Sequence, residues 1–157
     1  MTKIADYAYM RNFSLEEALI PLNVAEIGNN AFFMCTNLKT LKMQNVKTVG
    51  INAFYGCIAL KDIDFGNALT IIKIESFHRC TSIEKLQFPD SIETIEPMAF
   101  YACKSLKEIY FGKSLSNIGY EAFDLCPDLE KIKMSRRLFS NLQTKFTAIF
   151  GKPQNSI

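Results

Sequence analysis

The chain has 157 residues, of which 48% are hydrophobic and 22% are charged, a composition typical of one globular domain with a sizeable core. Its formal net charge of +2 is too small to indicate nucleic-acid or membrane binding by itself. No apolar run reaches the roughly 18 residues of a membrane span, so the sequence contains none.

The first segment, MTKIADYAYMRNF (1–13), lacks the uninterrupted apolar stretch of a signal peptide. If the chain is complete, we expect it in the cytoplasm. If it is a fragment of a longer protein, a place at the cell surface or outside the cell stays open. The same segment starts a degenerate first repeat (4–26), in which Asn12 stands where each later repeat has a cysteine.

A repeat of 22 or 23 residues runs through the middle of the chain (27–134). Its clearest mark is Phe-x-x-Cys, found in AFFMC (31–35), AFYGC (53–57), SFHRC (76–80), AFYAC (99–103) and AFDLC (122–126). Apolar residues recur three, six and eight positions after every one of these cysteines. Self-similarity at such a period is typical of a solenoid, in which each coil packs only against its neighbours.

Each repeat contains a segment with strand periodicity and a segment with helix-like spacing. LKTLKM (38–43) and LKEIYF (106–111) alternate apolar and polar residues, which predicts half-buried strands paired in parallel about 4.7–4.9 Å apart. Segments such as IGYEAFDLC (118–126) are too short for an independent helix, so we expect a short helical or 3₁₀ turn on the opposite, convex side. Gly28, Gly50 and Gly119 are expected to form tight bends before these turns.

The repeated phenylalanines and cysteines are predicted to form the core. We expect the rings to stack one coil apart, with the cysteines as small apolar residues whose thiols donate weakly to backbone carbonyls. Side chains that stack in parallel are too far apart for disulfides, and spacings of 22 or 23 residues do not suit zinc. A catalytic pair of His78 and Cys80 is disfavoured, and we expect His78 to be exposed on the convex side. No cofactor or enzyme motif is found.

The last segment (135–157) departs from the repeat. Its apolar residues have near-helical spacing, and Gly151 and Pro153 supply stop signals; these apolar residues are Leu138, Leu142, Phe146, Ile149 and Phe150. We therefore predict an amphipathic helix that caps the open end of the stack. Residues 131–157 hold six Lys or Arg and no Asp or Glu, whereas residues 1–30 have a net charge of −2.

The repeat resembles the BspA-like leucine-rich repeat family, whose unit reads approximately L-x-x-L-x-L-P-x-x-L-x-x-I-G-x-x-A-F-x-x-C. The copy LQFPDSIETIEPMAFYAC (86–103), preceded by Ile83, matches it almost throughout, and the resemblance covers roughly residues 4–134. It implies an α/β leucine-rich repeat solenoid: a curved right-handed superhelix with parallel concave strands, short turns on the convex side and a C-terminal capping helix. The single domain (1–157) would comprise the degenerate repeat, the regular repeats and the cap (135–157).

The outward positions of the concave strands, which we call the strand face, are the predicted partner-binding surface. The candidate residues are Lys42, Asp64, Lys85, Gln87, Tyr110, Lys131 and Lys133. Tyr110 is the best anchor candidate, because interface hot spots are enriched in tyrosine. The same mixed row of charges also fits an idle solvated sheet, and that alternative stays open.

Two functional hypotheses follow. In the first, the chain is a non-enzymatic, monomeric protein-interaction or adhesion module that binds a protein partner on the strand face, as the resemblance to surface adhesins implies. In the second, it is a small intracellular repeat protein whose basic C-terminal end binds an anionic partner or self-associates. Neither hypothesis includes a cofactor, a metal or nucleic acid, and nothing in the sequence identifies the partner.

Overall fold

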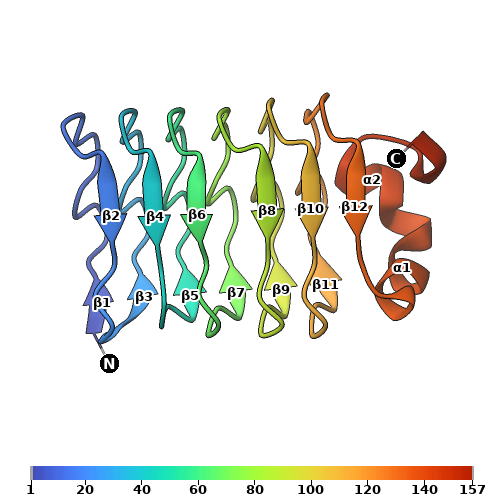
Figure 1. Ribbon diagram of the computed structural model, residues 1–157, viewed down its shortest axis with the longest axis horizontal. Coiled ribbons are helices and arrows are strands. Elements are labelled where there is room, and N and C mark those ends of the chain that lie inside the picture. The colour runs from blue at the N-terminus through green and yellow to red at the C-terminus, as the bar shows by residue number, and fades with distance from the viewer. Residues whose placement is uncertain (1, 157) are drawn as a thin grey trace.

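The computed structural model describes residues 2–156 and shows a parallel β-solenoid closed at one end by helices (Figure 1). The coils follow one another in a nearly straight row, with the chain termini at opposite ends (Figure 1). The predicted solenoid of parallel strands with a C-terminal helical cap is confirmed.

The strands of the strand face are three residues long and lie where the sequence places them. They are β2 (Glu17–Leu19), β4 (Thr40–Lys42), β6 (Asp62–Asp64), β8 (Lys85–Gln87), β10 (Glu108–Tyr110) and β12 (Lys131–Lys133). Their middle residues point inwards, and Leu41, Leu86 and Ile109 are fully buried. The flanking residues therefore point outwards, as the two-residue period of a strand requires.

A second, six-stranded parallel sheet was not predicted. It contains β1 (Thr2–Ile4), β3 (Val24–Ile27), β5 (Thr48–Val49), β7 (Ile71–Ile72), β9 (Thr94–Ile95) and β11 (Asn117–Ile118). Its register shifts once, between Thr2 and Lys3 in the β1–β3 pair, and is regular from β3 onwards, with Val49 opposite Ile72 and Ile72 opposite Ile95. This sheet is continuous along the whole described row of coils.

The third side of each coil is a run of turns, as expected. Cys35 N–H donates to Phe32 C=O three residues back (3.2 Å), whereas Met34 N–H crosses to Tyr55 C=O of the next coil (2.7 Å). The residues whose amides cross to the next coil have left-handed backbone conformations, with φ of 56° at Asn30 and 57° at Met34. On this side, the amides that cross between coils therefore point towards the C-terminal end.

The glycines before the turns have a different role from the one expected. Gly28, Gly50 and Gly119 do not have positive φ. A Cβ atom on Gly50 would lie 2.7 Å from the carbonyl oxygen of Ile27 in the preceding coil. Glycine serves at this position because the two backbones approach closely.

Stacked rings form the centre of the core. Successive pairs among Phe32, Phe54, Phe77, Phe100 and Phe123 have ring centroids 5.0, 5.0, 5.0 and 5.3 Å apart. A second stack, Phe65–Phe88–Phe111, meets the first edge to face. Each coil therefore contributes rings that only its neighbours can cover.

The five cysteines are free and buried, as predicted. Each thiol donates to a backbone carbonyl of the preceding coil, for example Cys57 Sγ to Phe32 C=O (3.2 Å) and Cys80 Sγ to Phe54 C=O (3.2 Å). Burial raises the pKa of all five thiols, and that of Cys126 to about 12. They are core residues kept in the thiol form.

The prediction that His78 is exposed is wrong, because only 7% of the residue is accessible. Its ring lies between Tyr55 and Tyr101, with centroids 4.6 and 4.9 Å away. Its Nδ1 is 3.5 Å from the Glu75 carboxylate and has no hydrogen-bond partner in the described chain. Burial lowers the pKa of His78, and the charge of Glu75 opposes that shift.

The C-terminal cap consists of α1 (Arg136–Leu142), a 3₁₀ turn (Gln143–Lys145) and α2 (Phe146–Phe150). All five apolar residues expected on its inner face are buried. Ser135 caps the N-terminus of α1, and its side chain accepts from Leu138 N–H (3.2 Å). The prediction of one helix is therefore refined to two short ones. Within residues 2–156, no helix is both long and apolar enough to cross a bilayer.

The cap completes the hydrogen bonding of the last coil. Phe150 stacks on Phe123 with centroids 5.6 Å apart. Glu121 N–H donates to Ala148 C=O (2.7 Å), and Phe123 N–H donates to Ile149 C=O (3.0 Å). These carbonyls belong to the last turn of α2, where they lack intrahelical partners. Helix and coil thus satisfy one another's free backbone groups.

Candidate functional site

The seven candidate residues all lie on the strand face and point away from the core. Lys42 is on β4, Asp64 on β6, Lys85 and Gln87 on β8, Tyr110 on β10, and Lys131 and Lys133 on β12. Six are exposed and Tyr110 is half-buried. The structure brings the last five of them together on three paired strands, β8, β10 and β12.

Tyr110 is the centre of a charged cluster that the sequence did not predict. Lys85 Nζ and Lys131 Nζ lie 4.8 and 5.2 Å from the centroid of its ring. The hydroxyl of Tyr110 donates to the Glu108 carboxylate (2.8 Å). Both ammonium groups lie within the range of cation–π contacts with the ring, and these contacts favour the orientation that the ring has here. We call Lys85, Glu108, Tyr110 and Lys131 the Tyr110 cluster.

The register of the strands explains the cluster. Lys85 and Lys131 both stand directly opposite Glu108, one on each side. Their long side chains reach the Tyr110 ring diagonally, as neighbours two positions apart can. The interaction with Tyr110, and after it the charge of Glu108, raise the pKa of Lys131. Gln87 and Lys133 stand directly opposite Tyr110 and complete the surface.

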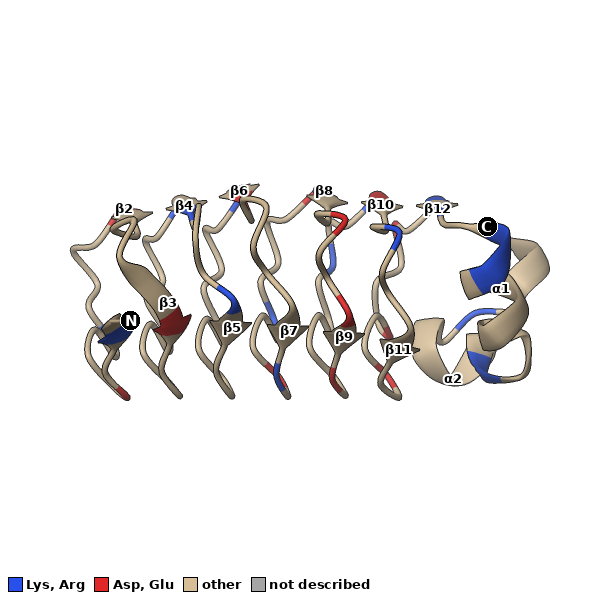
Figure 2. Cartoon of the chain, turned by 90° about the horizontal axis from the view of Figure 1, so that it is seen from below, with Lys and Arg blue, Asp and Glu red and all other residues tan. Residues whose placement is uncertain are grey.

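Lys42 and Asp64 lie apart from this cluster because the strand face is divided. β2, β4 and β6 form one three-stranded sheet, and β8, β10 and β12 form another. The two sheets are separated between β6 and β8, where the strands lie visibly further apart than their neighbours (Figures 1 and 2). The strand face is therefore interrupted between β6 and β8, and we call this interruption the seam.

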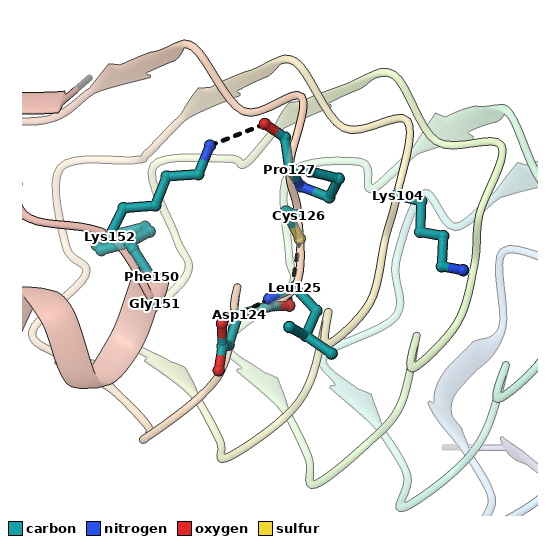
Figure 3. A pocket seen from close by; sticks show the side chains of 8 residues that line it. All are labelled: Lys104, Asp124, Leu125, Cys126, Pro127, Phe150, Gly151 and Lys152. Carbon is teal, nitrogen blue, oxygen red and sulfur yellow. Dashed lines mark hydrogen bonds between the residues drawn. The ribbon is translucent and has the colours of Figure 1, made fainter.

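A hollow of about 490 Å³ lies where the last coil meets the cap (Figure 3). Two of its polar side chains make structural contacts. Lys152 Nζ donates to Pro127 C=O (3.0 Å) and Leu129 C=O (2.8 Å). Asp124 accepts from Leu125 N–H (2.6 Å). We therefore attribute this hollow to the docking of the cap.

The basic C-terminal end presents fewer free charges than the sequence suggests. Arg136, Arg137 and Lys145 are exposed (Figure 2 shows basic segments in this cap). Lys152, in contrast, is used to bind the last coil. Among residues 2–156, no three His, Cys, Asp or Glu side chains are grouped as metal ligands would be.

Known proteins share both the repeat and the fold. A family described as BspA type leucine rich repeat region matches residues 2–130 and 70–149, with six copies. A leucine-rich repeat protein of T. pallidum is similar in structure, with a TM-score of 0.70 and 24% identity over 76% of this chain and 69% of its own. At that identity, the likeness concerns the fold. No curated protein matches the sequence closely enough to compare.

Two further solved structures are more similar in sequence. A leucine rich cell surface protein of Faecalibacterium prausnitzii is 31% identical, with a TM-score of 0.62 over 84% of this chain and 42% of its own. A leucine-rich repeat protein of Bacteroides ovatus is 29% identical, with a TM-score of 0.67 over 86% and 41%. The chain spans about two fifths of each. By its repeat and its coils, the chain belongs to the BspA-type leucine-rich repeat family.

Proposed function

We propose that the chain is a non-enzymatic protein-interaction module that binds a partner protein through the Tyr110 cluster on the strand face. Two considerations support this. A repeat scaffold offers an extended surface of outward side chains that the core does not need. The F. prausnitzii relative is described as a cell surface protein, so we extend the proposal to adhesion at a cell surface, with the chain acting as a monomer.

The single observation that carries the proposal is the clamped ring of Tyr110 between two ammonium groups. A tyrosine held in one orientation loses little conformational freedom when a partner covers it, which favours binding. Lys85 and Lys131 retain free N–H donors beside it, and Lys133 adds a third cation. The surface suits a partner that places a carboxylate, or a chain of polar groups, over an aromatic side chain.

The test compares two triple variants of the immobilised protein in pull-downs from cell extracts. One carries Tyr110→Ala, Lys85→Ala and Lys131→Ala. The matched control carries Tyr120→Ala, Lys104→Ala and Lys47→Ala, which remove the same side-chain types from exposed positions outside the strand face. We expect the first variant to lose partners that the wild type and the control both capture. Equal capture by both variants would remove the Tyr110 cluster from consideration.

The basic C-terminal end supports a second candidate function, binding of an anionic partner or self-association. The observation in its favour is the absence of acidic residues in 131–157, together with the exposure of Arg136 and Arg137. Binding through this end would weaken steeply with salt. Charge reversal by Arg136→Glu and Arg137→Glu would then abolish capture, while the Tyr110 triple variant would keep it.

A further inference from the structure

The seam between β6 and β8 leaves two strand edges without partners. Elsewhere on the strand face, two series of backbone bonds connect successive coils. Each bond runs from a backbone N–H to a backbone C=O. The first series is Lys39 to Glu16, Lys61 to Lys39, Lys107 to Glu84 and Glu130 to Lys107. The second series is Ile20 to Lys42, Met43 to Asp64, Phe88 to Tyr110 and Phe111 to Lys133. The members that would span the seam, Glu84 N–H to Lys61 C=O and Phe65 N–H to Gln87 C=O, are absent from the described chain. The two walls of the seam, β6 and β8 with the residues next to them, therefore both carry unpaired backbone groups.

The coils that form the seam are held together elsewhere. Behind it, β7 pairs with β9, and the rings of Phe65 and Phe88 stack with centroids 5.2 Å apart. Beside it, Lys61 Nζ is 3.0 Å from the Glu84 carboxylate. The opening is thus confined to the outer strand layer and has the core as its floor.

The seam is a groove. A hollow of about 310 Å³ and another of about 420 Å³ share Ile63, Asp64 and Gln87 in their linings. Ile63, the inward residue of β6, is only partly buried, whereas its counterparts on β4 and β8 are fully buried. The groove runs along the strands and offers apolar contacts at its base.

The charged side chains on the two walls of the groove differ in their contacts. On β8, Lys85 is directed to the Tyr110 ring of the neighbouring strand β10. On β6, Asp62 and Asp64 are exposed, and no ion pair joins either to a Lys or Arg among residues 2–156. Asp64 accepts only from Gln44 (2.8 Å) and Gly66 N–H (2.9 Å). Lys42 of β4 stands directly opposite Asp64, and Lys85 keeps its charge on the other wall, so the charges around the groove are mixed. The negative charge is concentrated on the β6 wall, where two carboxylates are in no ion pair of the described chain.

We propose that the seam binds an extended peptide segment of a partner protein, in which apolar residues alternate with Lys or Arg. The peptide backbone pairs with an open strand edge, the mode known as β-augmentation. Alternate side chains then point down to Ile63 and Phe65 or up to Asp62 and Asp64. This inference rests on the proposed function, since it names the partner chemistry of the same strand face.

The test uses a fluorescent seven-residue peptide of alternating lysine and valine, with binding measured by anisotropy. One comparison peptide replaces lysine by glutamate. Another keeps the lysines but is N-methylated at alternate backbone amides, which removes donors and leaves the charge unchanged. We expect the lysine–valine peptide to bind and both comparison peptides to bind at least about tenfold more weakly. Amide exchange at Phe65 or Glu84 should slow in the complex.

The protein variants separate the seam from general charge effects. Asp62→Asn with Asp64→Asn should weaken binding at least about tenfold, whereas Asp128→Asn with Glu130→Gln, a matched exposed acidic pair in the last coil, should leave it unchanged. Absence of binding, equal binding of the N-methylated peptide, or equal loss in both variants would overturn the proposal. If the Tyr110-dependent capture persists in that case, only the seam is refuted; if that capture also fails, the proposed function fails with it.

Discussion

The rings of Phe77 and Phe100 lie parallel, with centroids 5.0 Å apart and planes inclined by 2°. Phe65 and Phe88 approach these rings edge on, at 5.9 and 5.6 Å. The rings of Phe77 and Phe100 are therefore each covered by the coil before, the coil after and the neighbouring stack. Because no ring can be buried by its own coil, stability depends on the contacts between coils.

Replacing Phe77 tests this dependence. Phe77→Ala should lower the free energy of unfolding by about 3–5 kcal/mol, because it removes one fully buried ring and leaves a cavity. Urea unfolding followed by circular dichroism measures the loss. Tyr120→Ala, at a side chain that is 58% exposed, is the control and should change stability by less than about 0.5 kcal/mol. Similar losses in both variants would contradict the ring stack as the main stabilising element.

The thiol of Cys126 predicts a loss of stability at high pH. Its pKa is about 12 in the folded protein and about 9 when unfolded, so only the unfolded state releases the proton between these values. The contribution of this thiol is complete below pH 9 and decreases by about 1.4 kcal/mol per pH unit as pH rises from 9 to 12. In urea titrations from pH 8 to 10.5, Cys126→Ala should show a correspondingly smaller decrease than the wild type. If the free energy of unfolding decreased equally with pH in both proteins, the proposed contribution of Cys126 would be contradicted.

His78 predicts the opposite dependence at low pH. Because burial lowers its pKa, with Arg79 adding to the shift and Glu75 opposing it, the unfolded state gains a proton before the folded one. Stability from this group is complete above about pH 6.5 and decreases as pH falls below that value. His78→Phe keeps a ring between Tyr55 and Tyr101. Its free energy of unfolding should decrease less steeply than that of the wild type between roughly pH 7 and pH 5. The difference between the two proteins isolates His78 from the carboxylates common to both.

Gly151 predicts a steric requirement at the end of the cap. Its φ is 64°, and a Cβ atom there would collide with the Asp124 carboxylate. Gly151→Ala should therefore cost about 1–2 kcal/mol from backbone strain alone, and detach the cap more readily. Thermal unfolding measures the loss, with Thr147→Ala, an exposed change on α2, as the control. Equal melting temperatures for the two variants would refute the requirement.

The sequence predicts the features that depend on periodicity. The strands of the strand face, the ring stack and the buried cysteines recur in each of the five coils with Phe-x-x-Cys, so the repeated pattern identifies them. The helical cap was found because Leu138 and Leu142 change the period from that of the coil to that of a helix. Both signals reflect burial, which controls residue type strongly.

The remaining features depend on contacts between coils that no single segment encodes. Strands such as Thr48–Val49 contain two residues, too few to show an alternation. His78 is buried because Tyr55 and Tyr101 stand before and behind it; comparing the residue after each Phe of Phe-x-x-Cys could have revealed that stack. The seam leaves no mark, since Asp62–Asp64 alternates as every other strand does.

The direction of the turn-side hydrogen bonds determines how such a chain can change in length. Each of these amides points to the following coil, and the last ones end on the carbonyls of Ala148 and Ile149. Suppose that a unit of 23 residues, such as 81–103, is duplicated at any point before the helices. Its turn-side amides would donate to carbonyls of the following coil, and its own carbonyls would accept from amides of the preceding coil. We expect such a duplication to lengthen the rod by one step and leave both extremities intact, whereas half a unit would put every later ring out of phase.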